Sequence, residues 1–198
     1  IGAHYDSMAD YCADDNASGC AAMLEVVRIL SKYKFKYTIV YGFWDEEEQG
    51  LIGSAYYAKG IKKNNENIMG ALNMDMIGYD NNNDTKYEIH TKAGGSLAMS
   101  DKLQQITTAY SFKLSPIVKN PGTDRSDHAS FWAQGYNAIH FSEALNFKVA
   151  AKLNHLEPQD VIVELLICRQ FSKTRLCNFK HFSFEFTGIK EGDEHLFE

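Results

Sequence analysis

Residues 37–43, Tyr-Thr-Ile-Val-Tyr-Gly-Phe, decide the fold class of this chain of 198 residues. β-Branched and aromatic side chains fill the stretch almost without interruption, as expected of a strand that is covered on both faces. An acidic run, Asp45-Glu-Glu-Glu48, follows directly and marks the end of the strand. We therefore predict that residues 37–43 form a central strand of a sheet with helices on both of its faces.

Helical and strand-like patterns alternate around this stretch. Residues 17–32 place Ala21, Leu24 and Leu30 on one stripe at helical spacing, which predicts an amphipathic helix. Similar patterns predict strands at 68–76, 86–90, 113–118 and 137–141, and helices at 51–59, at 97–110, after Ser126 and at 160–171. The alternation predicts an α/β fold, a three-layer sandwich in which a mixed, mainly parallel sheet is flanked by helices.

The composition limits the classes of function. The chain holds 20 Lys and Arg against 26 Asp and Glu, a net charge of −6, and lacks the basic clusters that track nucleic-acid phosphates. No apolar run approaches the roughly 20 residues of a membrane-spanning helix. A hydrophobic fraction of 44% suffices for a single core. We expect one globular domain with neither a nucleic-acid partner nor a membrane span.

The predicted first strand is short at its amino end. Only Ile1-Gly-Ala precedes His4, although a strand usually has about five residues. We therefore expect that the leading strands of the domain are missing from this chain. The domain then covers residues 1–171, and residues 172–198, which mix aromatic and charged side chains at no clear period, form a tail without an assigned fold.

Acidic and histidine side chains follow the predicted strands. They stand in five segments: His4-Tyr-Asp6, Asp14-Asp-Asn16, Asp45-Glu-Glu-Glu48, Asp75 and Ser126-Asp-His128. Each segment alone has an ordinary structural explanation, such as a helix N-cap at Asp14-Asp-Asn16. Carboxylates that meet at one edge of an open α/β sheet, however, repel one another and resist burial unless a cation compensates them. Taken together, the segments predict a divalent metal site.

The motifs around these residues occur in the order of a known family. They are Ala3-His-Tyr-Asp-Ser7, Ala13-Asp-Asp-Asn-Ala-Ser-Gly19, Glu47-Glu-Gln-Gly-Leu51 with Gly53-Ser54, Asn73-Met-Asp-Met-Ile-Gly78 and Ser126-Asp-His128. As a set they resemble the co-catalytic di-zinc aminopeptidase family, which includes bacterial leucyl aminopeptidases, glutamate carboxypeptidase II and the glutaminyl cyclases. The resemblance spans roughly residues 1–160 and is greatest for the aminopeptidase branch.

The resemblance implies two Zn²⁺ ions with a defined set of ligands. His4 would bind one zinc, Asp15 would bridge both ions, Glu48 would bind the first zinc and Asp75 the second. The implied fifth ligand is His155, in Asn154-His-Leu-Glu-Pro-Gln-Asp160, with His128 as the alternative. The family also implies a cis peptide bond after the bridging acid, between Asp15 and Asn16.

The resemblance also implies a reaction. Glu47 would be the general base, Asp6 would orient the imidazole of His4, and Asp127 and His128 would support the site or the substrate. The implied activity is that of an aminopeptidase, which hydrolyses the N-terminal bond of a peptide or protein with a zinc-activated bridging water. Secretion or a periplasmic location is expected from the family alone, and the oligomeric state stays open.

Two alternatives to an aminopeptidase stay open. A glutaminyl-cyclase-like zinc acyltransferase would use one metal ion, whereas Asp15 and the run from Glu47 to Leu51 resemble the peptidase branch more closely. A catalytically degenerate binding module of the same fold would have lost its ligands, yet four ligands and the base are present in the sequence. Metal content and hydrolysis of aminoacyl amides would separate the three.

Overall fold

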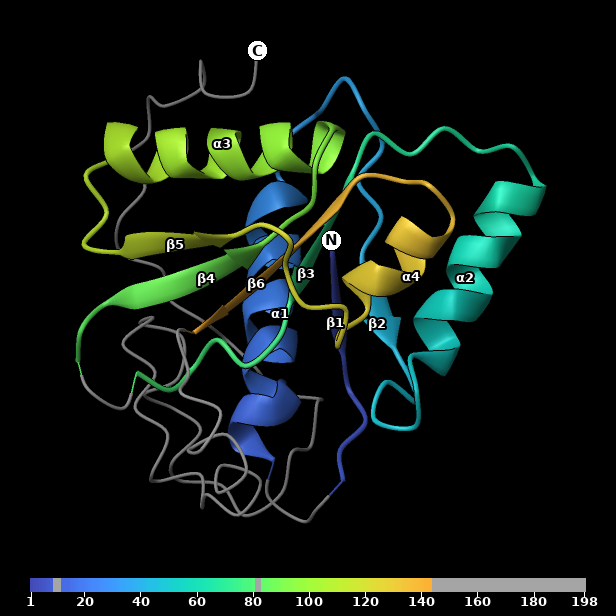
Figure 1. The fold of residues 1–198 in the computed structure, drawn as a ribbon, viewed down its shortest axis with the longest axis horizontal. Coiled ribbons are helices and arrows are strands. Elements are labelled where there is room, and N and C mark those ends of the chain that lie inside the picture. Colours follow the sequence, from blue (N-terminus) through green and yellow to red (C-terminus); the bar gives the residue numbers. More distant parts are fainter. Residues whose placement is uncertain (9–11, 81–82, 144–198) are drawn as a thin grey trace.

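A computed structural model describes residues 1–8, 12–80 and 83–143, which form a six-stranded sheet with helices (Figure 1). The strands are β1 (Gly2–His4), β2 (Gly42–Trp44), β3 (Ala71–Met74), β4 (Lys86–His90), β5 (Ser115–Lys119) and β6 (Ala138–Glu143). The helices are an irregular helical turn, η1 (Ala13–Ser18), and α1 (Gly19–Leu30), α2 (Ile52–Lys63), α3 (Gly95–Ala109) and α4 (His128–Ala133).

The sheet is mixed and mainly parallel, as the sequence predicted. Its strand order is β2-β1-β3-β6-β4-β5, and every neighbouring pair is parallel except β4 and β6. The carboxyl ends of β1, β2, β3 and β6 therefore point to the same edge of the sheet. At the antiparallel junction, His140 of β6 lies level with Asn73 of β3 on one side and with His90 of β4 on the other.

Alternating residues of the strands divide the helices between the two faces. On one face, Met74 packs with α1, and Ile139 packs with the α3 side chains of Met99 and Leu103. On the other face, Ala71 and neighbouring strand residues pack against α2 and α4. Since successive side chains of a strand point to opposite faces, the described residues form three layers, which confirms the predicted sandwich.

The prediction of a central strand over residues 37–43 is wrong. The strand begins only at Gly42, and β2 lies at the edge of the sheet that the described residues form. Tyr37 and Val40 are 59% and 46% exposed. The apolar run gave a wrong prediction because a sequence pattern indicates which side chains are expected to be buried. It carries no information about which strands lie next to each other. Position 42 requires glycine, because a Cβ there would collide with the Trp44 indole.

The other predicted elements agree with the structure, apart from their ends. Residues 86–90 match β4 at both ends, and α2 continues to Lys63 rather than stopping at residue 59. None of the described helices has the length and apolar character needed to cross a membrane. The predicted helix at 160–171, the domain boundary at 171 and the tail 172–198 lie outside the described residues.

Candidate metal centre

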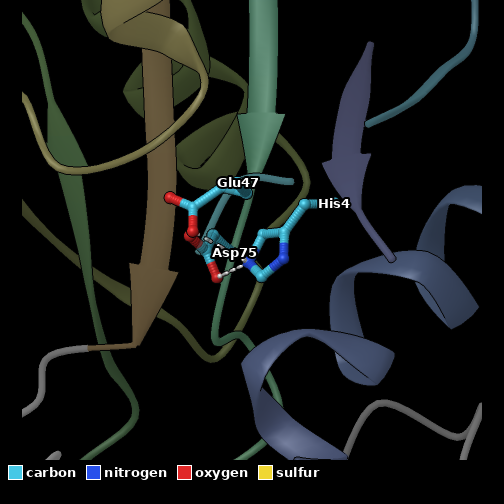
Figure 2. Close-up of side chains that lie close together, drawn as sticks. All are labelled: His4, Glu47 and Asp75. Atoms are coloured by element: carbon cyan, nitrogen blue, oxygen red, sulfur yellow. Dashed lines mark hydrogen bonds and ion pairs between the residues drawn. The ribbon is translucent and has the colours of Figure 1, made fainter. Parts of the chain in front are cut away.

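The carboxyl ends of three neighbouring strands bring the candidate ligands together. His4 ends β1, Asp75 follows β3, and Glu47 lies in the turn after β2. Their ligand atoms all lie within 4.8 Å of one another, and the three side chains converge on one point in Figure 2. Because β1 is paired in parallel with both β2 and β3, this convergence follows from the topology of the sheet.

Carboxylates surround one nitrogen of His4. The imidazole is fully buried, and its Nε2 lies 3.1 Å from Asp15 Oδ1, 3.3 Å from Asp75 Oδ1 and 4.0 Å from Glu47 Oε2. Its Nδ1 lies 3.2 Å from the backbone carbonyl oxygen of Asp6 and 3.3 Å from Oδ1 of that residue. Since both acceptors of Asp6 hold a proton on Nδ1, they leave Nε2 to serve as a ligand.

Asp6 also holds the turn that carries the two glutamates. Its Oδ1 accepts a hydrogen bond from the Glu47 N–H at 3.1 Å, and its Oδ2 accepts one from the Glu48 N–H at 3.2 Å. One carboxylate therefore ties His4 at the end of β1 to the turn after β2. The sequence suggested only the contact with His4.

Asp15 is placed by the irregular turn η1. The Asp15–Asn16 peptide bond is cis, as the family resemblance implied. On either side of Asp15, Asp14 accepts a hydrogen bond from the Gly78 N–H at 2.7 Å, and Asn16 Nδ2 donates one to the Met74 carbonyl at 2.9 Å. These bonds attach η1 to the end of β3 and the loop that follows, which carry Asp75, so the two acids are fixed relative to each other.

A row of polar side chains lies behind Asp75. Ser126 Oγ donates to Asp75 Oδ2 at 2.6 Å, Asn73 Nδ2 donates to Ser126 Oγ at 2.7 Å, and Asn73 Nδ2 also lies 3.3 Å from His140 Nδ1. His140 was not among the predicted site residues. The available signal was a histidine inside the otherwise apolar strand predicted at 137–141, which places a polar ring at a core position.

The remaining predicted site residues lie deeper or outside the described residues. His128 and Asp127 are fully buried at the start of α4, and His128 Nε2 lies 2.8 Å from the Thr123 carbonyl, so this nitrogen serves as a donor there. Burial lowers the pKa of His128 to about 4 and raises that of Asp127 to about 7. His155 is outside the described residues.

The electrostatics of the centre reflect an excess of buried acid. Burial raises the pKa of Glu47 to about 8, and burial together with the charge of Asp15 raises that of Glu48 to about 7. For His4, burial favours the neutral ring, yet hydrogen bonds to Asp15 and Asp75 raise its pKa to about 12. For Asp75, burial opposes ionisation, yet the His4 contact lowers its pKa. A cation among these groups would replace the protons that they otherwise retain.

The donor set fits zinc. One imidazole nitrogen and several carboxylate oxygens are ligands that Zn²⁺ accepts. Glu48 Oε1 is buried and has no hydrogen-bond partner among the residues that the structure describes. A buried carboxylate oxygen without a donor is costly unless a cation or a proton satisfies it. The residues present are therefore suited to hold zinc, and the Glu48 oxygen is available to it.

Fold and site together form a candidate metal centre at the carboxyl edge of a mixed α/β sheet. In a comparison with protein families, residues 1–164 match the family model of Peptidase family M28. The chain belongs to this family, which confirms the resemblance drawn from its motifs.

Individual relatives agree with the family assignment. Leucine aminopeptidase 1 of Ajellomyces capsulatus is 29% identical over 181 residues, 81% of this chain and 46% of the relative. A probable zinc metalloprotease of Pyrenophora tritici-repentis is 42% identical over 84 residues, 38% of this chain and 17% of the relative. The crystal structure of Legionella pneumophila LapA aminopeptidase aligns with a TM-score of 0.65 at 27% identity, covering 73% of this chain and 40% of that one. The chain spans less than half the length of these relatives.

Proposed function

We propose that the protein is a zinc-dependent aminopeptidase that removes the N-terminal residue of peptides, with Glu47 as the general base. The observation that carries the proposal is the position of His4 Nε2, which lies 3.1 Å from Asp15 and 3.3 Å from Asp75 beside the Glu47 carboxylate. The relatives named as aminopeptidases support the same activity. Export from the cytoplasm stays a prediction.

The contacts suggest how the ligands are shared between two zinc ions. His4 lies against Asp75 and Asp15, so we assign these three to the same ion. Asp15 would then also serve the second ion, which Glu48 would bind through its unpartnered buried oxygen. His155 stays the fifth ligand expected from the family resemblance, with His128 as the alternative. The family resemblance put Glu48 on the first ion and Asp75 on the second but did not say which of them His4 binds. The contact between His4 and Asp75 supports the assignment of His4 to the ion of Asp75.

Glu47 is positioned to move protons rather than to bind metal. Its carboxylate lies 4.0 Å from His4 Nε2, farther than the two aspartates, and Asp6 holds its backbone. When bound, zinc would polarise the peptide carbonyl and lower the pKa of a bound water. Glu47 takes the proton of the attacking water and returns it to the leaving amine. The side chain is 9% exposed, which keeps bulk water from competing for that proton.

The test compares two variants of the full chain. Glu47→Gln should abolish hydrolysis of leucine p-nitroanilide and leave zinc bound, because the ligands are unchanged. Glu46→Gln, the same change at the preceding residue, is the matched control and should keep activity. Turnover by Glu47→Gln would contradict the assignment of the base. Cyclisation of N-terminal Gln with one zinc per chain would instead identify an acyltransferase, and a folded chain without zinc a binding module.

A further inference from the structure

The second oxygen of Asp75 is held by a relay of side chains that ends on a histidine. Asp75 Oδ1 faces His4, and Asp75 Oδ2 accepts the Ser126 hydroxyl at 2.6 Å. Asn73 Nδ2 donates to Ser126 Oγ at 2.7 Å and lies 3.3 Å from His140 Nδ1. All four residues of the relay are at most 8% exposed, so water does not compete for these bonds.

The chemistry of each group fixes the direction of the bonds. A carboxylate only accepts, so the single hydrogen of the Ser126 hydroxyl goes to Asp75. The Ser126 oxygen must then accept from Asn73, which therefore presents its NH₂ group rather than its carbonyl. The second hydrogen of that NH₂ group needs an acceptor, and His140 Nδ1 is in position when its ring carries the proton on Nε2. His140 Nδ1 is thus the last acceptor of a relay whose direction the Asp75 carboxylate sets.

The His140 ring is itself fixed in place. His140 of β6 lies directly across from Asn73 of β3, so the backbone brings the two side chains together. The ring stacks on His128 with centroids 4.8 Å apart at 14°, and His90 lies on it with a centroid distance of 5.1 Å at 34°. A ring packed in this way cannot turn its Nδ1 away from Asn73 without disturbing its neighbours.

We propose that His140 is a positioning residue for the metal ligand Asp75, acting through Asn73 and Ser126 as the terminal hydrogen-bond acceptor of the relay. The inference rests on the proposed function, since it takes Asp75 to be a zinc ligand. Groups that orient a ligand from behind typically contribute 10- to 100-fold in metal affinity or activity, and a relay of buried bonds transmits the loss of its last acceptor.

The test uses the acceptor at residue 140. His140→Leu removes it and should weaken zinc binding about 10- to 100-fold, measured by competition with a chromophoric chelator. His140→Asn places a carbonyl oxygen two bonds from Cβ, where histidine has Nδ1, and should restore most of the affinity. At saturating zinc the His140→Leu chain should lose kcat while KM stays near the wild-type value, because the change acts on a ligand.

A matched control separates the relay from packing. His90→Gln removes one of the two rings that pack on His140 and leaves the His128 stack and the Asn73 contact in place, so zinc affinity should fall far less than in His140→Leu. Equal zinc affinity of wild type and His140→Leu, or equal losses in His140→Leu and His140→Asn, would overturn the inference. Should His140→Leu not fold, Asn73→Leu must show the same loss for the inference to stand. Failure of the wild-type chain to bind zinc would instead refute the proposed function.

Discussion

At the scale of single residues, Asp6 links the parts of the centre. Its carboxylate contacts His4 and accepts the backbone N–H groups of Glu47 and Glu48 at 3.1 and 3.2 Å. A ligand and the proposed base come from different strands, and this side chain is the bridge between them. Asp6 therefore acts on the geometry of the reaction without being placed at the reacting atoms.

Replacing Asp6 with asparagine tests this bridge. The amide keeps one acceptor and puts an NH₂ group against an N–H donor, so one hydrogen bond to the turn is lost. We expect Asp6→Asn to lower kcat/KM by about 10- to 100-fold, measured with an aminoacyl p-nitroanilide. The matched control is Asp45→Asn, an exposed acid in the same turn that accepts its neighbour's N–H and bonds the Tyr5 hydroxyl, whereas the N–H groups of Glu47 and Glu48 bond to Asp6, and it should stay near wild type. Equal effects of the two changes would contradict the role of Asp6.

The choice between His155 and His128 as the fifth ligand is also made by single substitutions. His128 directs Nε2 to the Thr123 carbonyl at 2.8 Å, and its buried Nδ1 has no hydrogen-bond partner among the described residues, so His128 stays the alternative to His155. We expect His155→Ala to reduce the zinc content from about two to about one per chain by atomic absorption, because a zinc site rarely keeps its ion with too few protein ligands. His128→Ala should retain both ions, and a loss of zinc in that variant would reverse the assignment.

At the scale of elements, η1 is the segment whose hydrogen bonds hold two ligand loops together. Asn16 is 1% exposed; its Nδ2 donates to the Met74 carbonyl, and its Oδ1 accepts from the N–H groups of Gly19 and Met76. These three bonds replace the regular backbone pattern that an irregular turn lacks. The short turn therefore depends on one side chain for its connection to β3.

Removal of that side chain should destabilise the fold. Asn16→Ala loses three hydrogen bonds, two of them buried, which corresponds to about 2–4 kcal/mol of unfolding free energy, measured by urea denaturation of the metal-free chain. Asn64→Ala is the control, because it removes an exposed side chain that donates to Glu66 at 3.3 Å, and it should change stability by about 0.5 kcal/mol or less. A similar small change at Asn16 would show that η1 does not depend on these bonds.

The sequence predicted which residues form helices and strands better than it predicted which strands lie side by side. The bounds of β4 were correct at both ends, because residues 86–90 alternate as a half-buried strand does. The edge position of β2 was not predictable, since strand order depends on contacts between distant segments. The same limit applies to the site. His4 and Asp75 stand out at strand ends, whereas His140 gains a role only from its register opposite Asn73.

At the scale of the whole molecule, the buried ionisable groups couple stability to pH. As the pH rises, the metal-free fold should become less stable and the stabilisation by zinc should become larger. Without metal, the raised pKa values of Glu47, about 8, and His4, about 12, mean that the folded chain retains protons that the unfolded chain releases near pH 4.5 and 6.5. This stability is present at low pH and is lost as the pH rises through the folded values. His140, whose pKa burial lowers to about 3, acts in the opposite sense only below its ordinary value of 6.5.

Thermal melting can measure this dependence. In the presence of a chelator, the melting temperature should be lower at about pH 8 than at about pH 6.5. Over this range the folded state loses the bound protons that stabilise it relative to the unfolded state. Added zinc should raise the melting temperature, and by more at pH 8 than at pH 6.5, since zinc needs deprotonated ligands. A zinc effect independent of pH would contradict the assignment of His4 and Glu48, whose pKa values are raised to about 12 and about 7, as ligands.

The indole of Trp44 gives the centre an optical signal of its own. Trp44 lies over Gly42 at the end of β2, three residues before Glu47, and its carbonyl accepts the N–H of Tyr5, next to His4. The chain has 2 tryptophans, and the other, Trp132, meets the His128 ring edge-on at a centroid distance of 4.4 Å. Both fluorophores therefore sit against the framework of the site, so intrinsic emission can follow zinc loading in real time without a label.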